Sequence, residues 1–581
     1  MKKNGFTIRC RPGLALIASI LAGLPSGWAA PPTAPATDPD LQAGFPVKAV
    51  HDGPGAFHDG PGIHTLVGNI DDTPDLEIIV SGHGVGPLYA WKANGTLVPG
   101  WPRAELPRFS YPALGALQGT PGKLDVIASY YGSSPSVHVA YSGTGAKLPG
   151  WPRNGANYVS GPPSTADIDG DGRDEIFVCE EDFAVHMYRY DGTSSVVAGS
   201  STQGCHTPAL ADLDGDGIPE IITTSDADTL GITLQAYSHT GFSLPGFPVR
   251  IGFHSPPDSF PVVGDVDGDG VVEIIVVISE DNFPWRPVAK IIGIDGTLKR
   301  EIVGEGVLRF STAPALADLD GDGVPEIIFQ ADNALNVVRG DGTPLPGWPV
   351  VWATDGGTRF SQGNSSPVVG DVDGDWLPDI VVTTHDLGGS TGEVRVYNRN
   401  GVSHPRFPKT LPIGGGAVPA IADIDLDGRN EIIVTGMFWN GVADFYDKVW
   451  VYDLGGAEHG PVHWGQFGGG PAHRGVYTLH SPGAHNVPPV ANAGPDQAIG
   501  SRQAVTLDGS GSSDSDGRIV RAAWKQLSGA PVSLSNASTL VARFTAPGLK
   551  GGLQETLVFE LTVTDDGGAT TSDQAVVVVR R

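Results

Sequence analysis

Carboxylate side chains recur at fixed spacing in this sequence, and one stretch shows the pattern well. Between residues 209 and 222, the first, third, fifth and ninth positions of a glycine-rich loop are Asp212, Asp214, Asp216 and Glu220. These acids repel one another unless a cation neutralises them, and calcium suits them because it accepts six to eight oxygen ligands in flexible geometry. We therefore expect a calcium loop, with the carbonyl of Ile218 as a backbone ligand. For one copy alone, an acidic solvated turn is the competing interpretation.

Repetition of the loop favours the metal site. Six copies keep all four acids, and their first aspartates lie 45 to 53 residues apart. In the last two copies Trp376 and Leu426 each replace a loop glycine, so those two sites depart from the pattern. The expected ligands of about six calcium ions are Asp167, Asp169, Asp171 and Glu175; Asp212, Asp214, Asp216 and Glu220; Asp265, Asp267, Asp269 and Glu273; Asp318, Asp320, Asp322 and Glu326; Asp371, Asp373, Asp375 and Asp379; and Asp423, Asp425, Asp427 and Glu431.

Two earlier copies of the segment have lost acids. The first keeps Asn69, Asp71 and Glu77 but has Thr73 where an acid stands elsewhere. In the second, around residues 112–128, only Asp125 remains, although the flanking apolar pattern persists. We count these as repeats without expecting calcium in them.

The elements that position the loops repeat with a period of about 50 residues, which is typical of a propeller or a solenoid. Each unit predicts an apolar strand entering the acid loop, a strand leaving it, an alternating strand such as 392–398, and a short strand around "LPGWP", as at 148–152. Four antiparallel strands make one propeller blade. We expect an all-β fold with eight blades, or seven if the first unit supplies only a closing strand. The phrases at 44–47 and 463–467 resemble outer strands, so one of them is expected to complete the last blade.

The N-terminus predicts export. Basic residues precede an apolar run from Leu14 to Leu24 and the phrase "SGWAA", which is typical of a secretory signal cut after Ala30. No later segment reaches eighteen apolar residues, so no transmembrane segment is expected. The net charge of −29 and the lack of a basic cluster argue against nucleic acid or anionic lipid as partner. We expect an extracellular, cell-surface or periplasmic protein.

Beyond residue 477 the period ends, and the chain divides accordingly. We expect a signal peptide (1–30), a flexible lead-in (31–40), the propeller (41–480), a linker (481–488) and a small immunoglobulin-like β-sandwich (489–581). Strict alternation in "TLVFELTVTDDGG" predicts the sandwich strands, with Trp524 as core aromatic.

Taken together, these units resemble FG-GAP/VCBS repeats, the blades of integrin α-type propellers, whose D-x-D-x-D-G-x-x-[DE] loops bind calcium. The resemblance spans residues 40–480 and implies that the four acids of each loop are ligands. The Phe-Gly and Gly-Ala-Pro phrases that name the repeat are largely missing, and Ala313-Pro314 is the nearest trace. The C-terminal residues resemble a PKD domain through "VANAGPDQAI", "SSDSDG" and "LTVTDDGG". That module often accompanies binding or carbohydrate-active proteins.

Two classes of function are compatible with this organisation. The favoured hypothesis is an extracellular binding or adhesion scaffold with structural calcium, whose partner is an unidentified protein or glycan. The alternatives are a glycan-binding lectin and a carbohydrate-active enzyme, since some polysaccharide lyases resemble this architecture. Catalytic candidates would lie in the repeated HDGPG phrase, but a local duplication in a loop explains that phrase equally well, and we expect no enzyme. Those candidates are His51, Asp52, His58, Asp59 and His64.

Cysteine placement predicts one disulfide. Cys179 lies four residues past Glu175, and Cys205 lies seven residues before Asp212. Both positions fall at the ends of neighbouring blades away from the acid loops, where a bridge is feasible in an oxidising compartment.

The connections between blades, on the face opposite the acid loops, contain recurrent arginine and aromatic residues. Such residues fit the composition of binding hot spots, and aromatic rings also stack on sugars. The alternative is that each aromatic ring packs between blades as part of the architecture. The candidate ligand face consists of Arg108, Phe109, Arg309, Phe310, Arg359, Phe360, Tyr158 and His254.

Overall fold

The structure is a computed structural model that describes residues 38–477 and 489–581 apart from short internal segments. Those segments are 51–64, 82–86, 104–108, 121, 132–134, 157–158, 160, 181, 200–204, 226–230, 253–259, 280–284, 309–312, 353–358, 361–365, 387–391, 412–417, 440–444, 457–458, 514–518, 538, 550–553 and 566–569. The expected signal peptide, most of the lead-in and the expected linker therefore lie outside the described residues.

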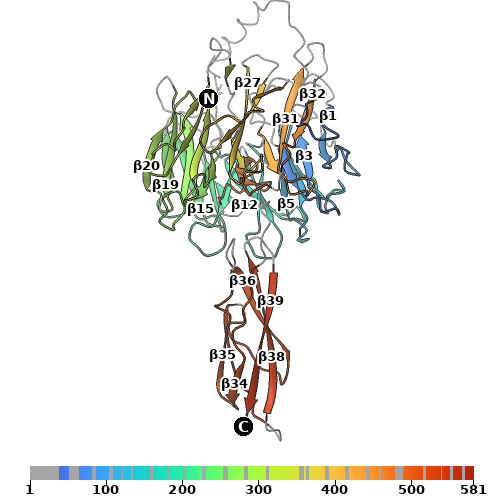
Figure 1. The fold of residues 1–581 in the computed structure, drawn as a ribbon, viewed down its shortest axis with the longest axis vertical. Helices are drawn as coiled ribbons and strands as arrows, with labels where there is room; N and C mark the ends of the chain where they lie inside the picture. The colour runs from blue at the N-terminus through green and yellow to red at the C-terminus, as the bar shows by residue number, and fades with distance from the viewer. Residues whose placement is uncertain are drawn as a thin grey trace, which may run out of the picture.

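Eight small antiparallel sheets form the larger unit of the molecule (Figure 1). Blade 1 has β2 (Thr65–Gly68), β3 (Glu77–Ser81) and β4 (Leu88–Trp91); blade 2 has β5 (Phe109–Gly115), β6 (Asp125–Tyr131), β7 (Val137–Tyr141) and β8 (Arg153–Asn154); blade 3 has β9 (Ser164–Ala166), β10 (Glu175–Glu180), β11 (Ala184–Tyr188) and β12 (Ser194–Gly199). Blade 4 has β13 (Ala209–Ala211), β14 (Glu220–Thr224), β15 (Ile232–Tyr237) and β16 (Val249–Gly252); blade 5 has β17 (Val262–Gly264), β18 (Glu273–Ser279), β19 (Pro287–Gly293) and β20 (Leu298–Val303). Blade 6 has β21 (Ala315–Ala317), β22 (Glu326–Ala331), β23 (Ala334–Val338) and β24 (Val350–Val351); blade 7 has β26 (Val368–Gly370), β27 (Asp379–Asp386), β28 (Gly392–Asn398) and β29 (Lys409–Leu411), and β25 (Arg359–Phe360) pairs with β27. Blade 8 has β30 (Ala420–Ala422), β31 (Glu431–Trp439), β32 (Phe445–Tyr452) and β1 (Val47–Val50).

The blades close into a ring. Each inner strand contacts the inner strands of two neighbouring blades, and the contact between β2 and β30 completes the circle. The all-β, eight-bladed propeller is confirmed, and the seven-bladed alternative is wrong. The phrase at 44–47 leads into β1, which pairs with β32 and supplies the outer strand of blade 8. The ring is therefore closed by the N-terminal end of the propeller.

Burial explains why the second strand of a blade is apolar in sequence and the outer strand is polar. The second strand of each blade is covered on both faces by neighbouring blades, so β18 is buried throughout and is apolar from Ile274 to Ile278. The outer strand β20 has one buried residue among its six and is rich in charge. Sequence hydrophobicity thus falls from the axis to the rim.

The "LPGWP" phrase takes a different structure from the one expected. It forms a turn, and the outer strands of blades 2, 4, 6 and 7 begin after its proline. Its aromatic ring is buried between blades: the indole Nε1 of Trp151 donates to the Tyr190 carbonyl, and that of Trp348 donates to the Arg399 carbonyl. The expected strand on this phrase is wrong, while the expectation that its aromatic residue packs between blades is confirmed.

A segment that follows blade 8 fills the axis of the ring. We call residues 460–477 the hub segment; it contains β33 (Val462–Trp464) and the 3-10 helix η2 (Phe467–Gly469). It pairs with β26 and accepts hydrogen bonds, through carbonyl, amide or hydroxyl oxygens, from the backbone N–H groups of the other seven blades. The donors are Val67, Leu114, Thr165, Leu210, Val263, Asp318 and Ile421. The phrase at 463–467, expected as an outer strand, instead lies against the inner strands.

The C-terminal unit is a separate elongated β-structure in Figure 1. One sheet contains β34 (Gln497–Gly500), β39 (Thr570–Arg580), β38 (Gln554–Asp565) and β36 (Ile519–Ser528), and the other contains β35 (Ala504–Asp508) and β37 (Val541–Thr545). Trp524 is buried in its core, as predicted, with Phe544 and Phe559. Among the described residues, no helix is long and apolar enough to cross a membrane.

Candidate metal centres in the acid loops

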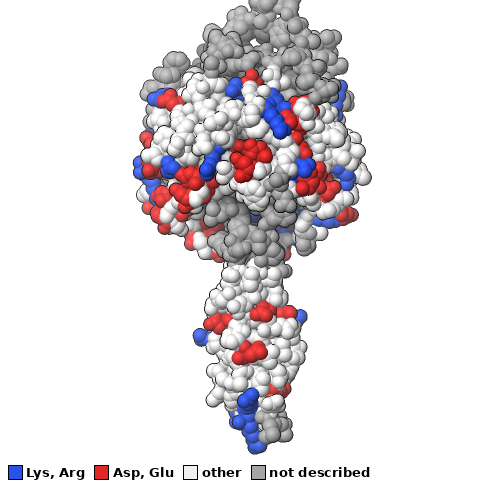
Figure 2. All heavy atoms as spheres, in the orientation of Figure 1, with Lys and Arg blue, Asp and Glu red and all other residues white. Residues whose placement is uncertain are grey.

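Each acid loop joins the inner strand of a blade to its second strand. We number the acids by their loop positions, so the first, third, fifth and ninth acids are those at positions one, three, five and nine. The first acid follows the inner strand. The ninth acid is the first residue of the second strand, as Glu220 is of β14. In blade 4 the ladder pairs Glu220 with Ala211, so the loop is anchored at both ends by strand hydrogen bonds. The same arrangement recurs in blades 3 to 8, and acidic patches mark the propeller surface in Figure 2.

Backbone N–H groups orient the carboxylates within each loop. In blade 4 both oxygens of Asp212 accept hydrogen bonds, from Gly215 at 2.7 Å and from Gly217 at 2.9 Å. Asp216 accepts from Ile218 at 2.8 Å, and Glu220 Oε2 accepts from Leu213 at 2.9 Å. Both glycines have positive φ, +80° and +87°, which an L side chain adopts at a cost. The curl of the loop thus places the carboxylates around one volume.

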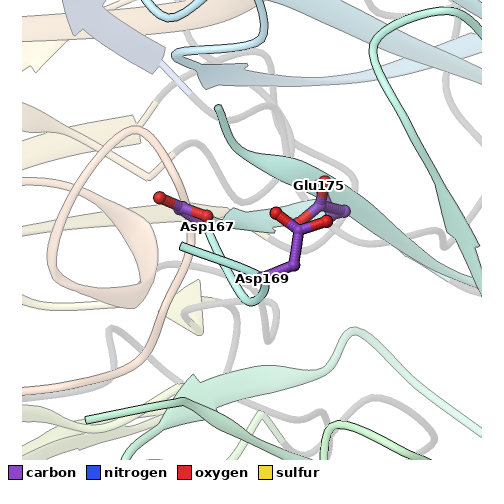
Figure 3. Close-up of side chains that lie close together, drawn as sticks. All are labelled: Asp167, Asp169 and Glu175. Atoms are coloured by element: carbon purple, nitrogen blue, oxygen red, sulfur yellow. The ribbon is translucent and has the colours of Figure 1, made fainter. Parts of the chain in front are cut away.

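The carboxylates converge closely enough to share a cation. In blades 3, 4 and 6 the first, third and ninth acids each place an oxygen within 4.8 Å of the others, and the same positions do so in blade 7. Figure 3 shows this in blade 3, where Asp169 projects from the loop and Glu175 from the start of β10. Several acidic clusters therefore have the donor set that a hard divalent cation prefers.

The ninth acid of each loop is buried, and burial perturbs its protonation. Burial raises the pKa of Glu431 to about 9 and that of Asp379 to about 8, and the neighbouring aspartates add to both shifts. The same cause raises the pKa of Glu175, Glu220 and Glu326 to about 7. Within the described residues, Glu431 Oε1 is buried without a hydrogen-bond partner. A carboxylate that is buried, crowded by other acids and partly unpaired is the group that a bound cation would stabilise.

Two loops keep their shape despite losing a glycine. Trp376 and Leu426 adopt positive φ, 65° and 59°, and both side chains are exposed. Trp376 N–H still donates to Asp371 Oδ2 at 2.8 Å, as the glycine does in other blades. The substitutions therefore change the loop surface without changing the positions of the acids.

Basic side chains reach some loops and not others. In the described part of the chain, no basic residue pairs with the acids of blade 4. Arg189 Nη2 lies 3.7 Å from Asp169 in blade 3, and Arg339 pairs with Asp320 in blade 6. In blade 5, Lys299 Nζ contacts three acids of the loop at once. These lysine and arginine contacts were missed from the sequence because they join residues 19 to 32 positions apart.

In blades 1 and 2, whose loops have lost acids, polar side chains bond the acids that remain. In blade 1, Lys92 Nζ lies 2.5 Å from Asp71 Oδ2, and this pairing raises the pKa of Lys92. Burial raises the pKa of Glu77 in the same loop to about 7. In blade 2, Gln118 donates to Asp125 through both its backbone N–H and its amide. Lys92 and Gln118 thus bond the remaining acids of these two loops, as a bound cation would in a loop with all four acids.

The remaining candidate residues divide between the described and undescribed parts. Cys179 and Cys205 form a disulfide between blades 3 and 4, with Cα atoms 5.7 Å apart. The HDGPG histidines and aspartates lie outside the described residues, as do most members of the candidate ligand face: Arg108, Tyr158, His254, Arg309 and Phe310. Phe109, Arg359 and Phe360 are described only as backbone of β5 and β25.

Comparisons with known proteins agree with this architecture. A family model for FG-GAP-like repeats matches residues 167–223, 318–382 and 371–434, and a model for the K319L-like PKD domain matches residues 493–579. The chain therefore contains FG-GAP-like repeats and a C-terminal PKD domain. No curated protein matches the sequence.

Solved structures similar to the chain cover either unit. The PKD domain from the KIAA 1837 protein is 37% identical, covers 17% of this chain and 92% of its own, and has a TM-score of 0.14. The V. cholerae biofilm matrix protein Bap1 is 12% identical, covers 75% of this chain and 92% of its own, and has a TM-score of 0.47. The BP39L lectin from Burkholderia pseudomallei is 14% identical, covers 61% of this chain and 98% of its own, and has a TM-score of 0.41.

Proposed function

We propose that the protein is an exported, calcium-binding propeller that acts as a binding scaffold outside the cell, with calcium in a structural role. The observation that carries the metal assignment is the buried ninth carboxylate of each loop, best seen at Glu431. Its Oε1 atom has no partner among the described residues, and three aspartates crowd it. A calcium ion supplies the missing positive charge and accepts several oxygen ligands at once.

The structural role follows from where the loops lie. Each loop ties the innermost strand of a blade to the second strand, which is the most buried part of the sheet. Metal bound only by the folded loop adds its binding free energy to folding, about 2.7 kcal/mol per site at a concentration one hundred times the dissociation constant. Affinities suited to extracellular calcium are on the order of 10⁻⁴ to 10⁻³ M.

Melting curves recorded with calcium and with excess chelator test this role. We expect chelation to lower the melting temperature of the propeller by many degrees. Asp214→Ala should lower it less than chelation does, because that variant disrupts one loop only. Identical melting curves in calcium and in chelator would refute a structural role for calcium.

We propose binding, not catalysis, as the activity. In support, five acidic clusters among the described residues, those of blades 3 to 7, consist of acid-loop residues. The matched modules, FG-GAP-like repeats and a PKD domain, include no catalytic domain. A rigid propeller presents its connecting loops for recognition, and the sequence predicts the candidate ligand face in those connections. Of its members, the structure describes Phe109 at the start of β5 and Arg359 and Phe360 in β25.

A glycan and surface-protein array, probed with and without calcium, would identify the partner. Once a ligand is known, the triple change Arg108→Ala, Arg309→Ala and Arg359→Ala tests the candidate ligand face. Lost binding with an unchanged melting curve assigns the site to that face. Retained binding would show that these three arginines are not part of the ligand site.

A pocket on the acid-loop face favours a glycan as a second candidate ligand class. It lies between the altered loops of blades 1 and 2 and has a volume of about 350 Å³. Its lining is more apolar than polar, with hydroxyl, amide and charged groups placed around the apolar surface, a mixture that suits the ring faces and hydroxyl groups of a sugar. The polar groups come from Asp71, Asp72, Thr73, Gln118, Thr120, Lys123, Ser142 and Thr144. Loss of glycan binding in Lys123→Ala, with the triple arginine variant still binding, would place the sugar here.

A further inference from the structure

In blade 5 a lysine ammonium group lies among the acids of the loop. Lys299 Nζ lies 2.6 Å from Glu273 Oε1, 3.0 Å from Asp267 Oδ2 and 3.3 Å from Asp269 Oδ2. These are the third, fifth and ninth acids of the loop. Within the described residues, no other acid loop has one basic nitrogen so near three of its acids.

The backbone of blade 5 explains how Lys299 reaches the loop. Blade 5 lacks the "LPGWP" phrase, and β20 begins directly after the turn at Asp295 and Gly296. The ladder pairs Ile292 with Leu298 and Ile291 with Arg300, so Lys299 is the extra residue of a β-bulge. A bulge redirects a side chain out of the regular alternation of a strand. Here it directs the lysine side chain to the acids.

Blade 3 provides a natural comparison for blade 5. It also lacks the phrase, and its turn "DGTSS" at 191–195 corresponds to "DGTLK" at 295–299, which places Ser195 at the position of Lys299. In blade 3 the register at Ser195 itself is regular, because Ser195 pairs with Met187 and Ser194 with Tyr188, and the bulge of β12 comes two residues later, at Val197. There the first, third and ninth acids converge, whereas the converging set in blade 5 is Asp265, Asp267 and Asp269, without Glu273.

We propose that Lys299 is a built-in cation that closes the acid loop of blade 5 in place of calcium. This proposal rests on the proposed function for the other five loops and corrects the expectation for the sixth. Calcium needs carboxylate oxygens at 2.3–2.6 Å from its centre. An ammonium group within hydrogen-bond distance of the same oxygens occupies that volume and repels a divalent ion by like charge. Blade 5 therefore folds without calcium, and the protein binds five calcium ions.

The test compares the number of bound calcium ions in the full-length protein and its variants, measured by native mass spectrometry after gel filtration in calcium. Asp267→Ala in blade 5 should leave the calcium number unchanged, because the ion is not there. The equivalent change in blade 4, Asp214→Ala, removes a ligand oxygen and should reduce the number by one. Loss of one ion in both variants would overturn the proposal. No loss in Asp214→Ala would instead refute the proposed calcium role itself.

Removing the lysine gives the reciprocal result. Lys299→Ser, which imitates blade 3, should add one calcium ion and increase the difference in melting temperature between calcium and chelator. Lys290→Met is the matched control: Lys290 lies in the same blade and pairs with Glu301, away from the loop, and the variant should keep the wild-type number. An unchanged number in Lys299→Ser, measured on folded protein in calcium, would overturn the proposal.

Discussion

Replacing Glu431 by glutamine should change stability in opposite directions with and without calcium. Glu431 is buried, and burial raises its pKa from 4.5 to about 9 in the metal-free loop. The folded protein therefore keeps a proton that the unfolded chain releases between these two pH values. Since the folded pKa is the higher one, this group's contribution to stability is fully present below pH 4.5 and declines as the pH rises towards 9.

The magnitude follows from linkage. At pH 8 the unfolded carboxyl is ionised while the folded one is protonated, which costs about 5 kcal/mol at about 1.4 kcal/mol per pH unit above 4.5. Glutamine avoids this cost and keeps an oxygen for the Ile424 N–H, which donates to Glu431 at 2.9 Å. Its amide N–H₂ replaces the unpaired oxygen and costs about 1–3 kcal/mol if it finds no acceptor. In chelator at pH 8 the variant should therefore be about 2–4 kcal/mol more stable than the wild type.

The sign reverses when the pH or the metal changes. At pH 5 the protonation cost is under about 1 kcal/mol, so the amide penalty dominates and the variant should be less stable than the wild type. In calcium the variant lacks a charged ligand and should again be less stable. The exposed residue Glu301 provides the control, because Glu301→Gln should shift stability by no more than about 0.5 kcal/mol in every condition.

Urea denaturation followed by tryptophan fluorescence, at pH 5 and pH 8 in chelator and in calcium, measures all four cases. The reasoning fails if metal-free wild type is equally stable at both pH values. It also fails if Glu431→Gln is the less stable protein in chelator at pH 8.

Three further predictions concern the hub segment, the lysine beside blade 8 and the disulfide. Gln466→Ala should destabilise the propeller by about 2–4 kcal/mol in denaturant titration, because its amide bonds both the N–H and the carbonyl of Val67 at 2.9 Å; an unchanged midpoint would contradict this. Lys409→Met should lower the free energy of unfolding by about 1–3 kcal/mol, since Lys409 holds Asp38 and Asp40 beside blade 8, and Lys48→Met is a comparison outside that cluster. Unfolded, unreduced protein should show no free thiol from Cys179 or Cys205, and titration of two thiols would refute the bridge.

Much of the ring could be predicted because its signals are local. One segment of nine residues contains all four acids of a loop: Asp212, Asp214, Asp216 and Glu220. The number of repeats of this segment predicts the number of blades. Blade number was settled by a long-range pairing, between β1 and β32, that the phrase at 44–47 only suggested. The loop acids were identifiable from spacing alone.

What could not be predicted depends on contacts between distant residues. Lys92 and Lys299 are ordinary surface lysines in sequence, and only the fold brings them to acids 21 and 26 residues earlier. The hub segment binds mostly through backbone carbonyls, which leave no mark on residue type. The "LPGWP" phrase forms a turn instead of the expected strand, and its tryptophan is buried through a contact with the next blade that the sequence does not show.

The hub segment has a mechanical consequence. The chain leaves the propeller from its axis, where Tyr477 accepts a hydrogen bond from the Asp318 N–H, and not from the rim of one blade. A pulling force on the C-terminal unit is therefore transmitted first to the hub segment, which bonds the blades one after another from Tyr477 back to β33. Tension should break these bonds in turn and extract the hub segment before it separates the strands of any blade.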